Sequence, residues 1–213
     1  VLANIVDADV YENWTDVSGF MVVDPRIIPN PISISRITYS ELREMSYMGA
    51  NVLHDDSVFP VREKNIPINI RNTNEPDHPG TMIMEDCSEM DKVDTPHAIT
   101  GITGRKNYTV ISLTKAHSSA EIGFLRKVLQ IFEKYNVSIE AVPVTVDTYS
   151  IVVQTHLINH CLYEIIGELK ETVHPEDIRV EDHQAMIAVV GREMKQRAGI
   201  SGQLLSEFGR NKI

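Results

Sequence analysis

The carboxy-terminal half of the sequence repeats itself after 76 residues (187 − 111). Without any gap, this shift aligns Ile111 with Ile187, Gly123 with Gly199, Leu129 with Leu205 and Phe132 with Phe208. An internal repeat of this length indicates a duplicated folding unit. The second copy stops at Ile213, opposite Val137, before its second strand is expected. We therefore expect the second copy to be incomplete in this sequence.

The first copy has a regular order of expected strands and helices. Strands are expected at 109–114, 137–146, 149–154 and 178–180, and helices at 122–132 and 162–169. The first helix has an apolar face made by Ile122, Leu125, Val128, Leu129 and Phe132. The order β-α-β-β-α-β is the ferredoxin-like split βαβ motif.

The first third of the sequence is less regular and predicts a different, α/β type of fold. Residues 1–6 read as the apolar end of a helix, so we expect the sequence to begin inside a folded element and to be a fragment. A strand is expected at 9–14, and a capping box at 38–41 starts a helix that ends near Gly49. A second helix is expected over 52–64 and a strand over 66–71. The proline-rich, acidic stretch 72–97 contains the expected domain boundary.

Charge and cysteine usage limit the partners. The formal net charge of −10 argues against nucleic acid, because phosphate backbones require clustered Lys and Arg. Cys87 and Cys161 are isolated, which fits a reducing cytoplasm. No stretch approaches the about 20 apolar residues of a membrane span, so no membrane partner is expected.

Several segments of the first third resemble one family, the aspartate kinases. Residues 14–20 (WTDVSGF) and 24–26 (DPR) are similar to the family run W-T-D-V-x-G-[FIV]-x-x-x-D-P-R. Residues 47–54 resemble F-G-A-K-V-L-H, and residues 66–73 and 79–81 resemble the closing runs N-I-P-x-x-[IV]-[KR]-[NS]-T and P-G-T. The tripeptide D-P-R alone carries little information, whereas the ordered set of these runs, followed by the tandem repeat, is specific for the family.

The resemblance implies a domain plan and a function. Residues 1–84 would be the C-terminal, nucleotide-binding part of an amino-acid-kinase domain, and 85–98 a linker. Residues 99–182 would be a first ACT domain with its preceding strand, and 183–213 the start of a second, truncated one. The implied reaction is ATP-dependent phosphorylation of the L-aspartate side chain with Mg²⁺, the first step of lysine, threonine and methionine synthesis. The family segments K-F-G-G-[TS]-S and S-x-R-G-G-S-D are absent, so no catalytic residue is assigned and this piece alone is expected to be inactive.

The resemblance also assigns an ATP-binding set, which comprises Thr15, Asp16, Met21, Arg26, Asn51 and Val52. The pair Thr15 and Asp16 would contact the adenosine, and the Arg26 guanidinium is a forked donor suited to phosphate. Met21 stands where the family often has Tyr, and Asn51 where it has Lys. Asn51 therefore brings no positive charge to the transferred phosphoryl group.

An amino-acid effector is expected between two ACT domains, as in the family. Its carboxylate would meet the start of the first helix, where free N–H groups and the helix dipole favour an anion. Glu140 would meet its amine. The predicted effector set is Ser118, Ser119, Glu121, Ile122, Gly123, Phe124, Leu125, Ser138, Ile139 and Glu140.

The resemblance makes lysine a more probable effector than threonine, and a homo-oligomer through the ACT domains the expected assembly. Two alternatives stay open. One is a non-catalytic ACT regulatory subunit that partners a kinase chain, and the other is a different amino-acid kinase with the same nucleotide loop. The tandem repeat argues against the second alternative.

Overall fold

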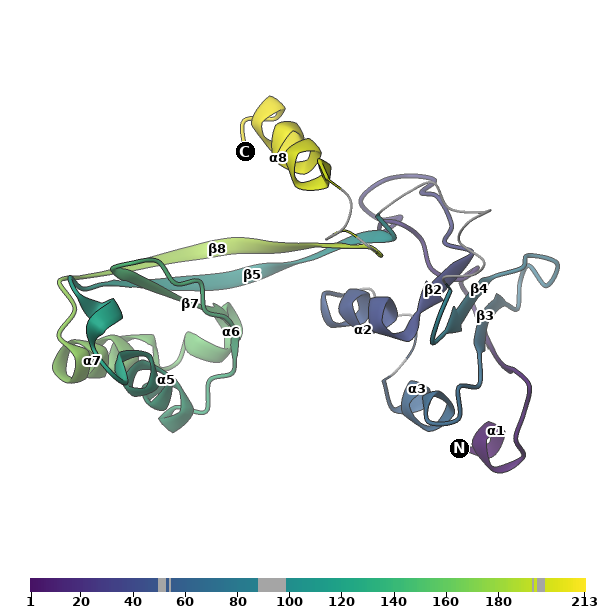
Figure 1. Ribbon diagram of the computed structural model, residues 1–213, viewed down its shortest axis with the longest axis horizontal. Helices are drawn as coiled ribbons and strands as arrows, with labels where there is room; N and C mark the ends of the chain where they lie inside the picture. Colours follow the sequence, from purple (N-terminus) through teal and green to yellow (C-terminus); the bar gives the residue numbers. More distant parts are fainter. Residues whose placement is uncertain (50–52, 54, 88–98, 193, 195–197) are drawn as a thin grey trace. The chain divides into compact units, whose positions relative to one another are not determined.

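The computed structural model describes all residues except 50–52, 54, 88–98, 193 and 195–197. The chain divides into two compact units, which are described separately (Figure 1). Unit 1 comprises residues 1–104 and 187–213, and unit 2 comprises residues 105–186. Unit 2 is therefore inserted into the sequence of unit 1.

Unit 1 contains a mixed four-stranded sheet in the order β1-β3-β4-β2. Its strands are β1 (Tyr11–Thr15), β2 (Arg36–Thr38), β3 (Ile68–Asn72) and β4 (Thr81–Met84). β1 runs parallel to β3 and β2 parallel to β4, whereas β3 and β4 are antiparallel. Ile37, Ile68, Ile70 and Ile83 are fully buried in this sheet, and in β3 the two isoleucines alternate with the polar residues Asn69 and Arg71.

The helices among the described residues of unit 1 are α1 (Leu2–Ile5), α2 (Tyr39–Tyr47), α3 (Asp55–Arg62) and α8 (Ile200–Arg210). The predicted capping box starts α2: the Glu41 N–H donates to Thr38 Oγ1 at 3.2 Å, and the Thr38 N–H donates to Glu41 Oε2 at 2.8 Å. Leu42 and Met45 face the core on the following turn. Part of the second predicted helix, 52–64, lies outside the described residues, and its described part contains α3.

Unit 2 has the predicted ferredoxin-like topology, with sheet order β6-β7-β5-β8. Its elements are β5 (Gly101–Thr114), η1 (Ser118–Ala120), α5 (Phe124–Lys134), β6 (Ile139–Ala141), β7 (Thr148–Gln154), α6 (Thr155–Ile158), α7 (Leu162–Val173) and β8 (Asp177–Val190). The first residues of β5 and the last residues of β8 belong to unit 1. Figure 1 shows α5 and α7 together on one side of the sheet. Phe132, Ile165 and Leu169 of these helices pack on Ile111 and Ile151 of the paired strands β5 and β7.

The predicted repeat is visible in the backbone. α5 and α8 have bounds that differ by 76 residues at both ends (200 − 124 and 210 − 134). Each follows a glycine N-cap in the left-handed region, with φ 80° at Gly123 and φ 94° at Gly199. Their packing differs, since Val128 and Phe132 of α5 are buried whereas α8 has no buried residue.

Some details depart from the sequence prediction. β8 continues without interruption as far as Val190, past the position of the boundary expected between residues 182 and 183, and its neighbour β5 begins earlier than the expected strand, at Gly101. The strand expected over 137–146 is confined to Ile139–Ala141. Ile122 is 98% exposed and precedes α5, so its predicted place on the apolar helix face is wrong.

Candidate functional site

The first candidate site lies at the carboxyl ends of β1 and β3, which meet because the strands are parallel. Such edges of α/β sheets commonly carry ligand-binding loops. The Thr15 carbonyl accepts hydrogen bonds from the Thr73 N–H at 2.8 Å and from Thr73 Oγ1 at 3.0 Å. The two loops that follow the strands are thereby joined at their bases.

A second set of polar contacts joins these loops farther from the ends of the strands. Asn72 Nδ2 donates to Ser18 Oγ at 2.8 Å, and Ser18 Oγ donates to Glu75 Oε2 at 2.8 Å. Asn72 Oδ1 accepts from the Asn74 N–H at 2.9 Å. The sequence analysis did not assign Ser18, Asn72 or Glu75 to a site. Ser18 and Asn72 do lie within the runs 14–20 and 66–73 that resemble the family, and all three residues follow expected strands.

The loop after β1 is fixed by Gly19 and Thr81. Gly19 has φ 90°, and a Cβ atom there would lie 2.3 Å from Thr81 Oγ1 and 2.8 Å from the Thr81 backbone nitrogen. The buried Phe20 N–H donates to the same Thr81 Oγ1 at 2.8 Å. A side chain at position 19 would push the loop off the sheet, so this glycine is required by both space and conformation.

The predicted ATP-binding residues fall into four groups, of which Arg26 is the last. Thr15 is the last residue of β1 and Asp16 begins the loop after it; Thr15 Oγ1 is 3.2 Å from Asp16 Oδ1, and Asp16 is exposed. Met21 is half-buried and forms an isolated bridge with Ser33. Asn51 and Val52 lie outside the described residues.

Arg26 lies farther along and already has an anionic partner. Its Nε is 3.0 Å from both carboxylate oxygens of Asp24, and its Nη2 is 2.6 Å from Asp24 Oδ2. These hydrogen bonds lower the pKa of Asp24 and raise that of Arg26. The Arg26 side chain is 84% exposed, so the guanidinium is accessible although it is paired.

The second candidate site is the segment before α5 in unit 2. Ser118 is 1% exposed, and its Oγ has no hydrogen-bond partner among the described residues, whereas Ser119 is exposed. Glu121 accepts from Lys115 Nζ at 2.6 Å and from Lys127 Nζ at 2.8 Å. The hydrogen bond from Lys115, followed by that from Lys127, lowers the pKa of Glu121 to about 2. This segment therefore gathers two ammonium groups around one carboxylate.

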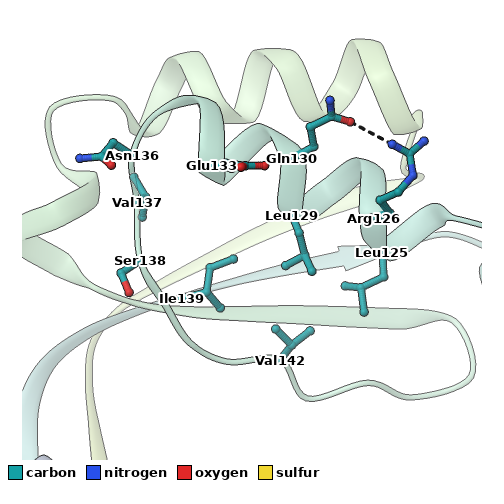
Figure 2. Close-up of a pocket in the computed structure, with 10 residues that line it drawn as sticks. All are labelled: Leu125, Arg126, Leu129, Gln130, Glu133, Asn136, Val137, Ser138, Ile139 and Val142. Carbon is teal, nitrogen blue, oxygen red and sulfur yellow. Dashed lines mark hydrogen bonds between the residues drawn. The ribbon is translucent and has the colours of Figure 1, made fainter.

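An open groove of about 1110 Å³ adjoins this segment between α5 and the edge strand β6 (Figure 2). Leu125, Leu129, Ile139 and Val142 point into it. Its polar lining includes Arg126, whose Nη1 donates to Gln130 Oε1 at 3.2 Å, together with Ser138. Phe124, in contrast, is buried in the core, with its ring 4.8 Å from that of Tyr149.

The predicted effector residues do not all meet in one module. Leu125, Ser138 and Ile139 line the groove. Ile139 packs on the helix-covered core, as does Val153 of β7, so the next residue of β7, Gln154, faces the other side of the sheet. The pairing of β6 with β7 is irregular between Ile139 and Ala141, and Glu140 lies on the same side as Gln154, which it contacts. There Glu140 Oε1 accepts from Gln154 Nε2 at 2.5 Å, and its negative charge contributes to the raised pKa of Tyr108, which burial chiefly causes.

None of the helices within the described residues has the length and apolar character needed to cross a membrane. The same part of the chain holds no group of three or more His, Cys, Asp or Glu placed to bind a metal ion.

Comparisons with known proteins give consistent matches. Residues 1–72 match the model described as "Amino acid kinase family". Aspartokinase 3 of Bacillus subtilis is 35% identical over 204 residues, which cover 95% of this chain and 44% of that protein. Lysine-sensitive aspartokinase 3 of Escherichia coli is 26% identical over 213 residues, which cover 96% of this chain and 44% of that protein. The crystal structure of Clostridium acetobutylicum aspartate kinase has a TM-score of 0.91 at 45% identity, covering 98% of this chain and 48% of that chain. The chain thus spans less than half the length of these relatives.

Proposed function

We propose that this chain, which matches aspartokinases in sequence and fold over less than half of their length, is part of an aspartate kinase. The enzyme would transfer the γ-phosphoryl group of ATP to the side-chain carboxylate of L-aspartate, in the cytoplasm. The observation that carries the proposal is the match to the Clostridium acetobutylicum enzyme along 98% of the chain at 45% identity. This match runs through both units and thus supports kinase and regulatory roles together.

Within such an enzyme, residues 1–84 would supply the nucleotide side of the active site. Thr15, Asp16 and Met21 lie on or beside the joined loops after β1 and β3, which suit a ribose and a base. Arg26 would exchange its half-buried Asp24 partner for an ATP phosphate, and Asn51 and Val52 of the separate run 47–54 would complete the set. The aspartate-binding and catalytic groups would come from the part of the relatives that the match does not cover.

Phosphoryl transfer depends mainly on positioning and charge neutralisation, and both features of the first site serve these needs. The hydrogen-bonded loops hold the nucleoside, and Arg26 places a forked cation at the phosphates. Mg²⁺ would enter bound to ATP, since the described residues hold no metal-binding cluster. Its contribution would be to neutralise charge on the phosphates.

Unit 2 and the segment after it would act as feedback-sensing ACT modules. The effector carboxylate would bind at the start of α5, where Lys115 and Lys127 already hold the Glu121 carboxylate. Because Glu140 faces away from that segment, it would meet the effector amine only in a site completed by a neighbouring module. A homo-oligomer formed through these modules follows, and the open apolar groove beside β6 supports it.

Lysine is the proposed effector. A lysine-sensitive relative from Escherichia coli matches 96% of the chain, and the additional ammonium of lysine suits an acidic partner such as Glu140. The match of residues 1–72 to the amino acid kinase family favours this enzyme over a separate regulatory subunit.

The decisive experiment uses the full-length protein that contains this chain. We expect purified full-length protein to form aspartyl phosphate from ATP, Mg²⁺ and aspartate, trapped as the hydroxamate, and the 213-residue chain alone to form none. Lysine should inhibit more strongly than threonine, and sedimentation should show a dimer or larger species. Absence of hydroxamate from the full-length protein would remove the kinase assignment, and an intact mass near that of this chain would favour the regulatory subunit.

A further inference from the structure

The buried carboxylate of Glu41 connects three segments that are far apart in the sequence. Glu41 is 6% exposed and lies in the first turn of α2. Its oxygens accept hydrogen bonds from Thr38 in the capping box, from Thr100 Oγ1, and from Arg192 Nε at 3.0 Å to each oxygen. A capping box needs only the first of these contacts. The other two partners, 59 and 151 residues away, have no role in starting the helix.

Thr100 and Arg192 have a specific place in the chain. Unit 2 spans residues 105–186, so Thr100 lies shortly before it and Arg192 shortly after it. The Thr100 N–H donates to the Val190 carbonyl at 2.8 Å, which holds the two segments together. Both connections of the inserted unit therefore converge on one carboxylate of unit 1.

The segment that enters the inserted unit also contacts the remainder of α2. Thr103 Oγ1 donates at 3.1 Å to the carbonyl of Met48, the C-cap of α2. Between these ends, a Cβ atom on Gly101 would lie 2.5 Å from Met45 Cε, so the strand approaches the helix closely. α2 is thus held at its first turn, its middle and its last turn.

The segment that leaves the inserted unit completes this arrangement. Val190 is buried in the same core cluster as Leu42 and Met45 of α2. Arg192 adds a hydrogen bond from Nη2 to the Arg36 carbonyl at 3.0 Å, at the start of β2. A change in the position of either segment must therefore move α2 or break buried polar contacts, and leaving a buried carboxylate unpaired is unfavourable.

The sequence that follows α2 links this arrangement to the proposed nucleotide site. α2 ends at Tyr47, and residues 47–54 are the run that resembles the kinase motif containing the proposed ATP-binding residue Asn51. We propose that Glu41, Arg192 and Thr100 are positioning residues that couple effector binding in unit 2 to the nucleotide site through α2. This inference rests on the proposed feedback-regulated kinase and assigns its coupling to these three side chains.

The test uses the full-length enzyme and three variants. Arg192→Met removes the charge, Thr100→Val removes one hydrogen-bond donor at constant shape, and Arg179→Met is the control, since Arg179 is an exposed arginine of β8. Hydrogen exchange of the α2 amides should be about tenfold faster in Arg192→Met, less accelerated in Thr100→Val, and unchanged in Arg179→Met.

Inhibition by lysine provides the functional measurement. In Arg192→Met, the lysine concentration for half-inhibition should rise about tenfold, while lysine affinity measured by calorimetry at zero ATP and uninhibited kcat stay within about twofold. If Arg192→Met speeds the hydrogen exchange of α2 but leaves lysine inhibition unchanged, the Glu41–Arg192 contact is purely structural and the inference is overturned. Unchanged hydrogen exchange of α2 in this variant would also overturn it. If lysine and threonine both fail to inhibit the wild type, the proposed feedback function fails as well, so the two failures are distinguishable.

Discussion

Arg26, the side chain proposed to bind an ATP phosphate, forms an exposed ion pair with Asp24. Asp24 is two residues away and binds the guanidinium through two nitrogens, which fixes its direction. Exposed pairs of this kind contribute little net stability, so a phosphate can replace the carboxylate at small cost. The pair therefore favours a positioning role over a stabilising one.

Replacing Arg26 in the full-length kinase should weaken its use of ATP. Loss of a charge-assisted hydrogen bond to a phosphate costs about 1.5–3 kcal/mol, so Arg26→Ala should lower kcat/KM for ATP about tenfold to a hundredfold. Steady-state kinetics at saturating aspartate measures this. Arg43→Ala, at an exposed position on α2, is the matched control and should leave the value unchanged. Equal kinetics for both variants would exclude Arg26 from the nucleotide site.

Glu121 predicts a pH dependence of stability. Its pKa falls from 4.5 to about 2 in the folded chain because Lys115 and Lys127 donate hydrogen bonds to it. A lowered folded-state pKa means that the contribution is complete above the unfolded pKa and is lost as the pH falls from about 4.5 to about 2. Glu121→Gln should thus lower Tm at pH 7, with the difference from wild type shrinking across that window. A Tm difference that does not depend on pH would contradict the ion-pair explanation.

The N-cap glycines of α5 and α8, Gly123 and Gly199, occupy equivalent left-handed positions, where replacement by alanine should destabilise the chain. A Cβ atom on Gly123 would meet only Arg126 Nε at 3.9 Å, and one on Gly199 would meet nothing within 4 Å. The cost of an alanine at either place is therefore conformational, about 1–2 kcal/mol. Gly167, inside α7 and without a positive φ, is the control, where alanine should stabilise by about 0.5–1 kcal/mol.

Urea denaturation of Gly123→Ala and Gly167→Ala should show these opposite signs. Gly199→Ala should reduce the helicity of α8, measured by hydrogen exchange, because no residue of that helix is buried and its own propensity matters more. Stabilisation by Gly123→Ala would mean that the helix start is not held in the left-handed region.

The regular elements could be predicted from sequence because their patterns are local. Periodicity located α5, α7 and β7, and the capping box located the start of α2. Ile122 was wrongly placed in the helix because the apolar periodicity of α5 extends back to it. The left-handed N-cap Gly123 separates Ile122 from the helix, which starts at Phe124. The role of Arg192 could not be predicted, since its pairing with Glu41 depends on a fold that joins positions 151 residues apart.

The candidate sites were predictable only in part. The family motif placed Thr15 and Asp16 after a strand, whereas in the structure Thr15 is the last residue of that strand and Asp16 follows it. The motif did not indicate the hydrogen bonds of Ser18, Asn72 and Glu75 that join the two loops. Strand alternation would have separated Glu140 from Ile139 onto opposite faces. The pairing of Glu121 with two lysines required the three-dimensional arrangement of η1 and α5.

Unit 2 has a core of its own, which predicts independent folding. Fifteen buried residues form one cluster within it, including Ile111, Phe132, Ile151 and Leu169. A chain of residues 101–190, which contains all of β5 and β8, should therefore unfold cooperatively on heating. Circular dichroism and calorimetry measure this transition. A broad transition without a near-ultraviolet signal would show that the core depends on contacts from the remainder of the chain.

The hydrogen bond between Thr100 and Val190 has a consequence for chain connectivity. The residues at which the inserted unit leaves and rejoins unit 1 are neighbours. The two ends of the inserted segment are therefore already close together in unit 1. Loop-closure entropy grows only slowly with loop length, and here the paired strands β5 and β8 set the end-to-end distance. A unit attached in this way can be lengthened, exchanged or excised with a small change in the entropy of the host. A short hairpin turn between these strands would be sufficient to replace it.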